Sequence, residues 1–269
     1  MDADRRAPLI IAHRGASAHA PENTLAAFEL ALAEGADGLE FDVRLARDGV
    51  PVVIHDATLR RTNGRADKVA SLSSSALASV DVGSWFNRRF PRLARDEYAR
   101  QRVPTLAEVF EQFAPRCGTL YVELKCVRAD AAALAIATVS VLRANADNAR
   151  RCVVESFTLE ALIEIKRLAP ELRTAALFER SLKQPHVSTR AMIARARAHG
   201  ADEIALQRSL VSRRTIGAAR AAGLPTVVWT VDHPSWARRA TELGLRALIT
   251  NRPARLRAAL DAILVNRKS

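Results

Sequence analysis

The sequence predicts an α/β protein folded as a (β/α)8 TIM barrel, and three observations support this. The chain has 269 residues, enough for one large domain with a sizeable core. Short apolar runs alternate along it with longer stretches whose apolar residues recur at helical spacing. The number of apolar runs, once a hairpin is recognised among them, matches the eight parallel strands of such a barrel.

The expected strands are short and rich in Val, Ile and Leu, as strands buried on both faces require. They are 8–13, 38–43, 51–55, 119–124, 152–156, 174–178, 203–206, 225–229 and 246–250. The expected helices are 24–34, 105–114, 131–145, 158–169, 188–199, 212–222, 235–243 and 253–264.

One of these strands is surplus to a barrel, and the run 51–55 is the one that the spacing sets aside. Asp48-Gly49, a strong hairpin turn, lies between it and the preceding strand. A parallel crossover needs about a dozen residues or more, which this connection lacks. We therefore expect 51–55 to run antiparallel to the extended end of 38–47.

The stretch 57–103 interrupts the alternation of strands and helices. It is polar and rich in arginine, with apolar anchors at Trp85, Phe86 and Phe90. We expect a small insertion that follows the hairpin and covers the barrel mouth, within a single domain of residues 1–269. A disordered loop is the alternative, which the aromatic anchors disfavour.

The net charge of +12 admits a polyanionic partner. The arginines are scattered rather than gathered in a block, which favours solvated helix faces and weighs against nucleic acid as a partner. The three cysteines Cys117, Cys126 and Cys152 form no CxxC pair, so we expect free thiols in a reducing compartment.

No apolar run has the length of a membrane span, so we expect no stable membrane insertion. The apolar run before His13 is too short for the core of a signal peptide. We therefore expect a cytoplasmic location. The sequence leaves the oligomeric state open.

Three carboxylates lie on expected strands. Glu40 and Asp42 are two residues apart, so both point to one side of their strand, and Glu123 lies near the end of the next barrel strand. Side chains at the carboxyl ends of barrel strands meet at one mouth. A divalent cation would relieve their repulsion, and oxygen ligands favour Mg²⁺ or Ca²⁺. The alternative for each carboxylate alone is an ion pair with a base such as Arg44 or Lys125.

Two histidines lie beside this cluster. His13 ends the first strand, and the hairpin would return His55 to the same mouth. Imidazoles suit general acid and base catalysis near neutral pH. Arg14 offers a planar fork for phosphate oxygens, and Lys125 could add a second positive charge. These groups suit metal-assisted cleavage of a phosphate ester.

Residues 13–64, HRGASAHAPENTLAAFELALAEGADGLEFDVRLARDGVPVVIHDATLRRTNG, closely resemble the opening of the glycerophosphodiester phosphodiesterase family. Later pieces of the family pattern follow in order: WF, PTLAEVF, VELK, VVESF, WTVD and LGLRALITNRP. The resemblance covers nearly the whole chain and implies hydrolysis of a small glycerophosphodiester to glycerol 3-phosphate and an alcohol. A related, lysophospholipase D-like reaction on lipids is the alternative, with Trp85, Phe86 and Phe90 as the candidates for a membrane-facing rim.

The resemblance also assigns roles to positions of this chain. It implies an acid–base pair of His13 and His55. It implies a divalent cation, Mg²⁺ or Ca²⁺, on Glu40, Asp42 and Glu123. It implies phosphate contacts from Arg14 and Lys125, and an aromatic contact to the substrate from Trp229.

Two positions depart from the family pattern. Asp232 stands where Asn is common, and Asn251 stands where Asp is common. We expect neither to contact the cation or the histidines, and both to affect the loop near Trp229.

The segment PENT has two explanations. It is typical of a helix start, with Asn23 or Thr24 as the cap. The alternative is that Glu22 or Asn23 supports the site.

Overall fold

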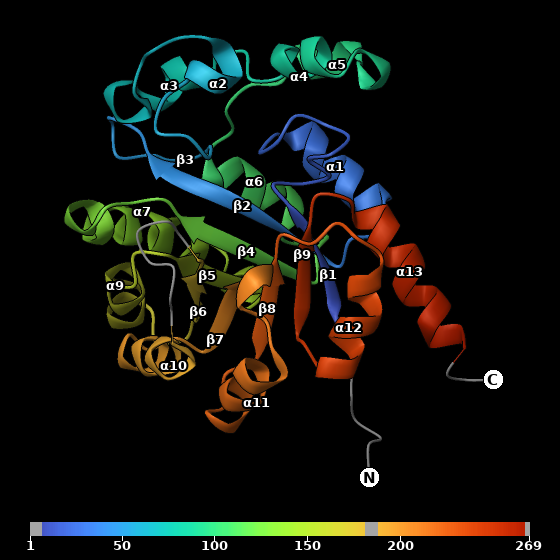
Figure 1. Ribbon diagram of the computed structural model, residues 1–269. Helices are drawn as coiled ribbons and strands as arrows, with labels where there is room; N and C mark the ends of the chain where they lie inside the picture. The colour runs from blue at the N-terminus through green and yellow to red at the C-terminus, as the bar shows by residue number, and fades with distance from the viewer. Residues whose placement is uncertain (1–6, 181–187, 267–269) are drawn as a thin grey trace.

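The computed structural model describes residues 7–180 and 188–266. Eight parallel strands close into a barrel in the order β1-β9-β8-β7-β6-β5-β4-β2, and β1 also pairs with β2 (Figure 1). The strands are β1 (Leu9–His13), β2 (Gly38–Leu45), β4 (Thr119–Leu124), β5 (Cys152–Ser156), β6 (Arg173–Phe178), β7 (Glu203–Gln207), β8 (Thr226–Trp229) and β9 (Ala247–Thr250). The expected (β/α)8 architecture is confirmed.

Helices surround the barrel between successive strands. They are α1 (Leu25–Ala33), α6 (Leu106–Phe113), α7 (Ala131–Arg143), α8 (Ala146–Ala149), α9 (Glu160–Leu168), α10 (Thr189–Ala198), α11 (Arg213–Ala221), α12 (Ser235–Leu243) and α13 (Pro253–Val265). Hydroxyl side chains fix several starts: Thr24, Ser188 and Ser212 each accept a hydrogen bond from a backbone N–H three residues on. Thr105 and Glu108 form a reciprocal capping box at α6.

The hairpin expected after β2 is present. Strand β3 (Pro51–Val53) runs antiparallel to β2, with Val53 opposite Val43 and Pro51 opposite Leu45. The Ile54 N–H also donates to the Asp42 carbonyl at 2.9 Å. The chain after β3 therefore returns toward the carboxyl ends of the barrel strands.

The barrel interior is filled from the amino ends of the strands. Ile11, Tyr121, Val153, Ala205 and Val227 belong to one buried cluster inside the ring. At the amino end, the buried Glu203 accepts a hydrogen bond from the Tyr121 hydroxyl at 2.8 Å and pairs with Arg246 at 2.9 Å. With this end closed by its own ion pair, the opposite end is free to form a site.

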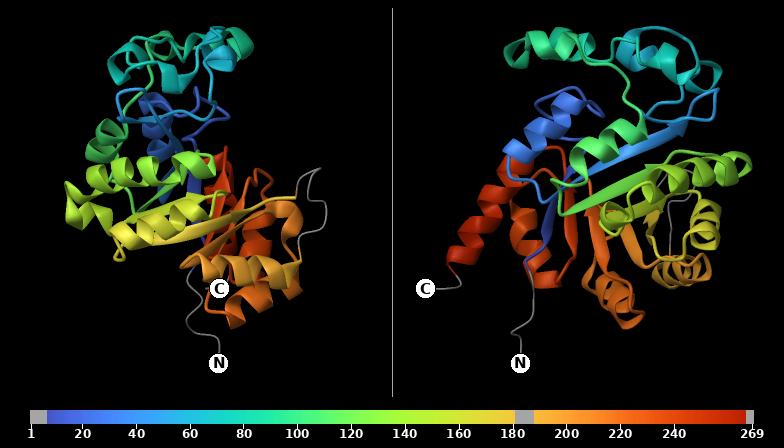
Figure 2. Two further views of the ribbon diagram at one scale, coloured as in Figure 1. Left: turned by 90° about the vertical axis from the view of Figure 1, so that its left-hand side faces the viewer. Right: turned by 180° about the vertical axis from the view of Figure 1, so that it is seen from behind.

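Residues 57–103 fold into short helices rather than a disordered loop. These are α2 (Arg60–Asn63), α3 (Ser74–Leu77), α4 (Ser84–Arg89) and α5 (Asp96–Ala99). Figures 1 and 2 show them as a group beyond β3 and α1, apart from the other helices. One apolar cluster joins this insertion to the hairpin through Val52 and Ile54, and another packs Phe86 and Tyr98 against Ala27 of α1.

Within the described ranges, no helix is both long and apolar enough to cross a bilayer. Cys117, Cys126 and Cys152 are free thiols, the first and last of them buried.

Replacing Phe86 with alanine should loosen the insertion from the barrel. The Phe86 ring is fully buried and lies 5.7 Å from the Tyr98 ring, so truncation leaves a cavity and should lower the free energy of unfolding by about 3–5 kcal/mol. Phe90→Ala is the matched control, since Phe90 belongs to the same segment but is 38% exposed. Urea denaturation compares the two variants, and equal losses would contradict this account of the packing.

Candidate active site

Three buried carboxylates meet at the carboxyl end of the barrel. Asp42 on β2 stands opposite Glu123 on β4 in the strand register, and Glu40 lies two residues before Asp42 on the same face. None of the three residues is more than 6% exposed. One oxygen of each lies within 4.8 Å of the others. The structure therefore brings together the three residues expected to hold a cation.

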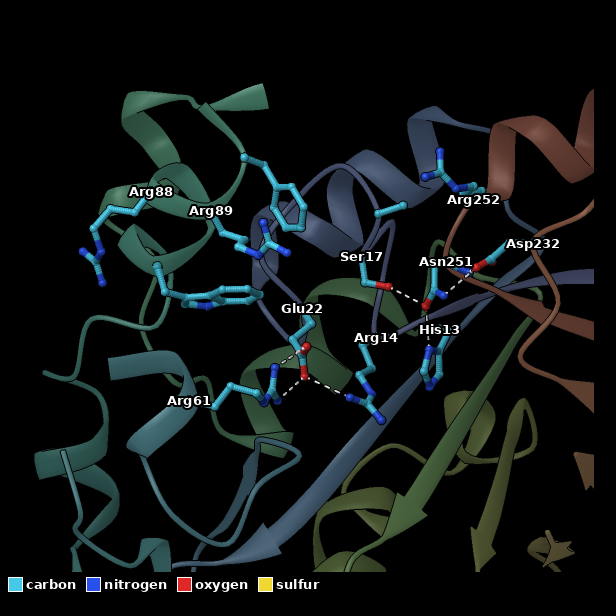
Figure 3. A pocket seen from close by; sticks show the side chains of 13 residues that line it. His13, Arg14, Ser17, Glu22, Arg61, Arg88, Arg89, Asp232, Asn251 and Arg252 are labelled. Carbon is cyan, nitrogen blue, oxygen red and sulfur yellow. Dashed lines mark hydrogen bonds and ion pairs between the residues drawn. The ribbon is translucent and has the colours of Figure 1, made fainter. Parts of the chain in front are cut away.

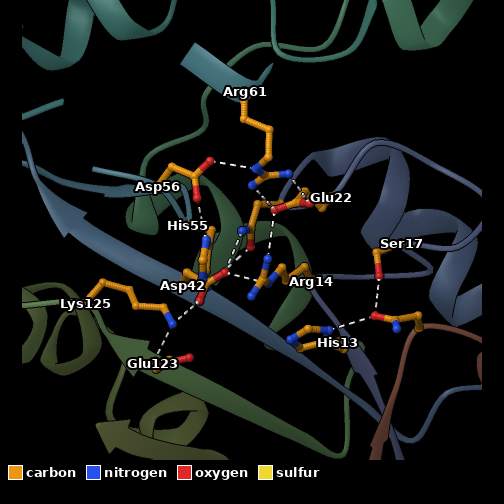
Figure 4. Close-up of polar contacts among 12 residues, drawn as sticks. His13, Arg14, Ser17, Glu22, Asp42, His55, Asp56, Arg61, Glu123 and Lys125 are labelled. Carbon is orange, nitrogen blue, oxygen red and sulfur yellow. Dashed lines mark hydrogen bonds and ion pairs between the residues drawn. The ribbon is translucent and has the colours of Figure 1, made fainter. Parts of the chain in front are cut away.

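Two basic side chains face the carboxylates (Figure 4). Lys125 Nζ lies 2.7 Å from Glu123 Oε1 and 3.3 Å from Asp42 Oδ1, and Arg14 Nε lies 3.0 Å from Asp42 Oδ2. Against the effect of burial, Arg14 and Lys125 hold the pKa of Asp42 well below its usual range. Asp42 is therefore the member of the cluster that most favours the ionised form.

The other two carboxyl groups favour protons in the absence of a metal ion. Burial and the charge of Asp42 raise the pKa of Glu123 to about 7. Burial, with the charges of Asp42 and Glu123, raises the pKa of Glu40 well above its ordinary value. Lys125 and Arg14 thus do not fully compensate the negative charge that the three carboxylates would carry if all were ionised.

The cluster fits a hard divalent cation. Opposed oxygen ligands of Ca²⁺ are about 4.6–5.2 Å apart, and those of Mg²⁺ about 4.0–4.2 Å. The ligand oxygens of Glu40, Asp42 and Glu123 span 4.8 Å at most, so small side-chain movements suffice for either ion. An all-carboxylate set also matches the preference of these ions for oxygen.

His13 is fixed from behind by an amide. Its Nδ1 lies 2.7 Å from Asn251 Oδ1, while Asn251 Nδ2 donates to Asp232 Oδ2 at 2.8 Å. The amide oxygen must accept, so the neutral ring carries its proton on Nδ1 and has a free lone pair on Nε2. Nε2 lies 3.9 Å from Glu40 Oε2. Burial and the charge of Arg14 lower the pKa of His13 to about 4.

The expectation that Asp232 and Asn251 avoid the histidines is wrong for Asn251. Strand β9 pairs with β1 so that Thr250 stands opposite Ala12, which places the next residue of each strand side by side. Asp232 accepts from the Asn251 N–H at 2.8 Å and from the Thr250 hydroxyl at 2.9 Å. A partnership between residues 238 apart in the chain gave no local signal in the sequence.

His55 is fixed by a carboxylate instead. Its Nδ1 lies 2.6 Å from Asp56 Oδ1, and Arg61 Nε lies 2.6 Å from Asp56 Oδ2. Arg44 Nε donates to the His55 carbonyl at 2.7 Å. Burial lowers the pKa of His55, with a contribution from Arg14, although Asp42 and Asp56 oppose the shift. The sequence reasoning gave no role to Asp56 or Arg61, although Asp56 directly follows a candidate histidine.

The turn after β1 is strained at the site. Arg14 and Asn23 have φ of 55° and 57°, a conformation that side chains with a Cβ seldom adopt. The Arg14 N–H donates to the Glu40 carbonyl at 2.7 Å, and the Asn23 N–H donates to the Arg14 carbonyl at 3.0 Å. Asn23 Nδ2 donates to Asp42 Oδ2 at 2.8 Å. Thr24 caps α1, as expected, whereas Asn23 supports the carboxylate cluster.

A cavity of about 520 Å³ joins these groups inside the mouth, and we call it the inner cavity. Its lining includes His13, Arg14, Glu40, His55, Glu123, Lys125, Glu155, Phe157 and Trp229. The rings of Trp229 and Phe157 meet edge to face at 5.5 Å. Within the described ranges, Trp229 Nε1 and Glu155 Oε2 are buried without a hydrogen-bond partner, as expected of groups that await a polar ligand.

Glu155 was missed by the sequence reasoning. It stands opposite Glu123 in the register of β4 and β5 and is 1% exposed. The available signal was a charged residue near the carboxyl end of an apolar strand, since Glu155 is the second-last residue of 152–156. Burial, with the charges of Glu40 and Glu123, raises the pKa of Glu155 well above its ordinary value.

A second cavity of about 800 Å³, the outer cavity, opens between the barrel and the insertion (Figure 3). It shares His13 and Arg14 with the inner cavity. Glu22 lies on its wall and pairs with Arg14 at 3.0 Å and with Arg61 at 2.7 Å. Glu22 thus connects Arg14, which follows His13, to Arg61, which pairs with Asp56 beside His55.

Comparison with known proteins identifies the family. Residues 13–255 match the model of the glycerophosphoryl diester phosphodiesterase family. The chain belongs to this family. It is therefore an enzyme, a phosphoric diester hydrolase of the glycerophosphodiester phosphodiesterase class.

Relatives of this family match the chain over most of its length. A glycerophosphodiester phosphodiesterase of Caldanaerobacter subterraneus is 30% identical, with 92% of this chain and 96% of the relative covered. A probable glycerophosphodiester phosphodiesterase 1 of Mycobacterium tuberculosis is 34% identical, over 94% of this chain and 93% of the relative. A solved phosphodiesterase of Oleispira antarctica, in complex with the product sn-glycerol-3-phosphate, has a TM-score of 0.81 at 28% identity, over 95% of this chain and 97% of that chain.

Exchanging the two departing residues tests the role of the amide. The double variant Asn251→Asp/Asp232→Asn exchanges the amide and the carboxylate without changing the net charge, and it places the carboxylate against His13 Nδ1. We expect the pKa of His13 in the metal-free protein to rise by about 1 unit or more, because an adjacent carboxylate favours imidazolium. NMR titration of labelled histidine measures it. Asp232→Asn alone should give no rise, and an unchanged pKa in the double variant would refute the assignment.

Proposed function

We propose that the protein hydrolyses glycerophosphodiesters to glycerol 3-phosphate and an alcohol with the help of a divalent cation. The observation that carries this proposal is the inner cavity, in which two imidazoles and two cationic side chains surround a buried carboxylate cluster. Family membership and the product complex of a similar structure support the same reaction.

Glu40, Asp42 and Glu123 would hold the cation, Mg²⁺ or Ca²⁺. When bound, it supplies charge that stabilises the phosphoryl oxygens and a hydroxyl of the substrate. Lys125 and Arg14 would neutralise further charge on the phosphate, which is supported by their position in the lining of the inner cavity and their contacts with the cluster. Their contacts with Asp42 keep both side chains oriented toward the carboxylate cluster.

His13 and His55 would transfer the protons. Each has Nδ1 bound to an oxygen acceptor, so each neutral ring has a free Nε2 lone pair. One imidazole takes a proton from the nucleophile, and the other gives a proton to the leaving alcohol. The nucleophile is water or the adjacent glycerol hydroxyl, and in the second case water then opens a cyclic phosphate.

The glycerol arm fits the inner cavity. Trp229 and Phe157 offer apolar faces to its carbon atoms, while Trp229 Nε1 and Glu155 Oε2 offer polar atoms that have no hydrogen-bond partner among the described residues. Of the three aromatic residues expected for a lipid-facing rim, Phe86 is fully buried, Trp85 is partly buried and Phe90 is 38% exposed, so a continuous apolar rim is absent among them. The small, water-soluble diester is therefore the substrate we propose.

Loss of either imidazole should abolish most of the activity. We expect His13→Ala and His55→Ala each to lower kcat for glycerophosphocholine by about 10²–10⁴-fold, because each removes a proton-transfer group. Glycerol 3-phosphate release is measured with Mg²⁺, with Ca²⁺ and with EDTA. His199→Ala, at the end of α10, should retain full activity. Activity that survives both EDTA and His13→Ala would overturn the proposed site.

Cation binding should release protons. Glu123, with its pKa near 7, and Glu40 must ionise before they bind the ion, so affinity should increase with pH. Calorimetry with Mg²⁺ or Ca²⁺ in buffers of different ionisation enthalpy should show more protons released at about pH 6 than at about pH 8.5. Glu123→Gln should bind the ion more weakly and release fewer protons. Binding without proton release would contradict the assignment of ligands.

A further inference from the structure

We propose that the outer cavity binds the leaving alcohol and selects glycerophosphodiesters whose alcohol carries a second phosphate group. This inference rests on the proposed function and adds a substrate class to it. It begins from the two cavities that meet at His13 and Arg14. A diester with its phosphate at this junction has one arm in the inner cavity and the other arm in the outer one.

The outer cavity has an excess of positive charge. Five arginines and two carboxylates line it: Arg14, Arg61, Arg88, Arg89 and Arg252, with Glu22 and Asp232. Glu22 is engaged by Arg14 and Arg61. Asp232 is engaged by Asn251 and Thr250. Across residues 7–180 and 188–266, no carboxylate pairs with Arg88, Arg89 or Arg252.

These three arginines come from both walls of the cavity. Arg88 and Arg89 end α4 of the insertion, and Arg252 lies in the connection between β9 and α13 of the barrel. Figure 3 shows Arg89 and Arg252 on opposite sides of the space above His13 and Arg14, with Arg88 beyond Arg89 and directed away from that space. Guanidinium groups bind phosphate oxygens with paired hydrogen bonds, and such groups on opposite walls suit an anion between them. The chemistry favours a phosphate group on the leaving arm.

The outer cavity disfavours a cationic alcohol such as choline. An aromatic face can bind a quaternary ammonium group, and Trp85 lines the cavity. However, the Arg61 guanidinium already lies 5.9 Å from the Trp85 ring centre, and the Trp85 Nε1 hydrogen bond to the Val82 carbonyl fixes the indole. A second cation there would be repelled by the arginines.

An anionic membrane is the other partner that arginines could bind. The small molecule is favoured because the arginines line a hollow continuous with His13. The phosphate on the leaving arm could be a terminal monoester or a second diester link. Both place anionic oxygens in the same space, and the test separates them.

The test compares two substrates that differ by one phosphate, glycerophosphoinositol and glycerophosphoinositol 4-phosphate. We expect kcat/KM to favour the phosphorylated substrate by about tenfold, and the preference to shrink as salt rises. In Arg88→Gln/Arg89→Gln the ratio of kcat/KM for the phosphorylated substrate to that for the unphosphorylated one should fall to about twofold or less. Each exposed ion pair with the added phosphate is weak alone, and the preference depends on several of them together. Arg252→Gln tests the opposite wall and should also lower the ratio.

Arg92→Gln is the matched control, because Arg92 lies in the same insertion but lines neither cavity. It removes the same charge and should leave the ratio as in the unaltered protein. Bis(glycerophospho)glycerol, whose leaving arm carries a diester, shows whether a diester link gains the same preference. A preference for only one of the two substrate types identifies the source and still supports the proposal.

Two results would overturn the inference. One is equal kcat/KM for the two inositol substrates in the unaltered protein, together with no gain in kcat/KM for bis(glycerophospho)glycerol. The other is a preference that survives both arginine variants. Arginine-dependent sedimentation with phosphatidylglycerol vesicles, together with no substrate preference, would show that the arginines of the outer cavity bind an anionic membrane instead. Failure to hydrolyse any of these diesters or glycerophosphocholine, with either metal ion, would refute the proposed function itself.

Discussion

The repulsion among buried carboxylates at the barrel mouth is the constraint on which the rest of the site depends. Glu40, Asp42 and Glu123 lie almost wholly out of water with their oxygens close together. Such a cluster costs free energy unless positive charge or protons compensate it. Lys125 and Arg14 stabilise Asp42 in its ionised form, and the remaining deficit is what a divalent cation would supply.

The supporting structure follows from holding those charges in place. Arg14 is held in a strained backbone conformation by hydrogen bonds to β2 and to Asn23. Asn23 also donates to Asp42, so one turn orients both the Arg14 side chain and the Asp42 carboxylate. Strain of this kind persists only where the surrounding contacts fix it, and here they do so at the proposed phosphate position.

The hairpin and the insertion give the mouth its two compartments. Strand β3 returns His55 to the barrel, and the insertion adds a second wall beyond β1. The two histidines are then oriented in different ways, since an amide holds His13 and a carboxylate holds His55. Burial lowers the pKa of His13 despite its hydrogen bond to the amide, and Asp56 likewise partly offsets the effect of burial on the pKa of His55.

The sequence by itself determined the barrel, the hairpin and the residues that form the centre of the site. Alternating patterns report which faces are buried, Asp48-Gly49 reports the turn, and a charged residue on an apolar strand stands out wherever it occurs. These are local signals, so they needed no knowledge of neighbours across the barrel. The same locality explains why Thr24 could be predicted as a cap.

Only the tertiary structure decided which residues surround that centre. Asn251 meets His13 because β9 closes against β1, and Glu155 meets Glu123 because β4 pairs with β5. The arginines of the outer cavity that pair with no carboxylate of the described residues likewise come from the insertion and from the connection between β9 and α13. Such contacts depend on strand order and register, which no short stretch of sequence encodes.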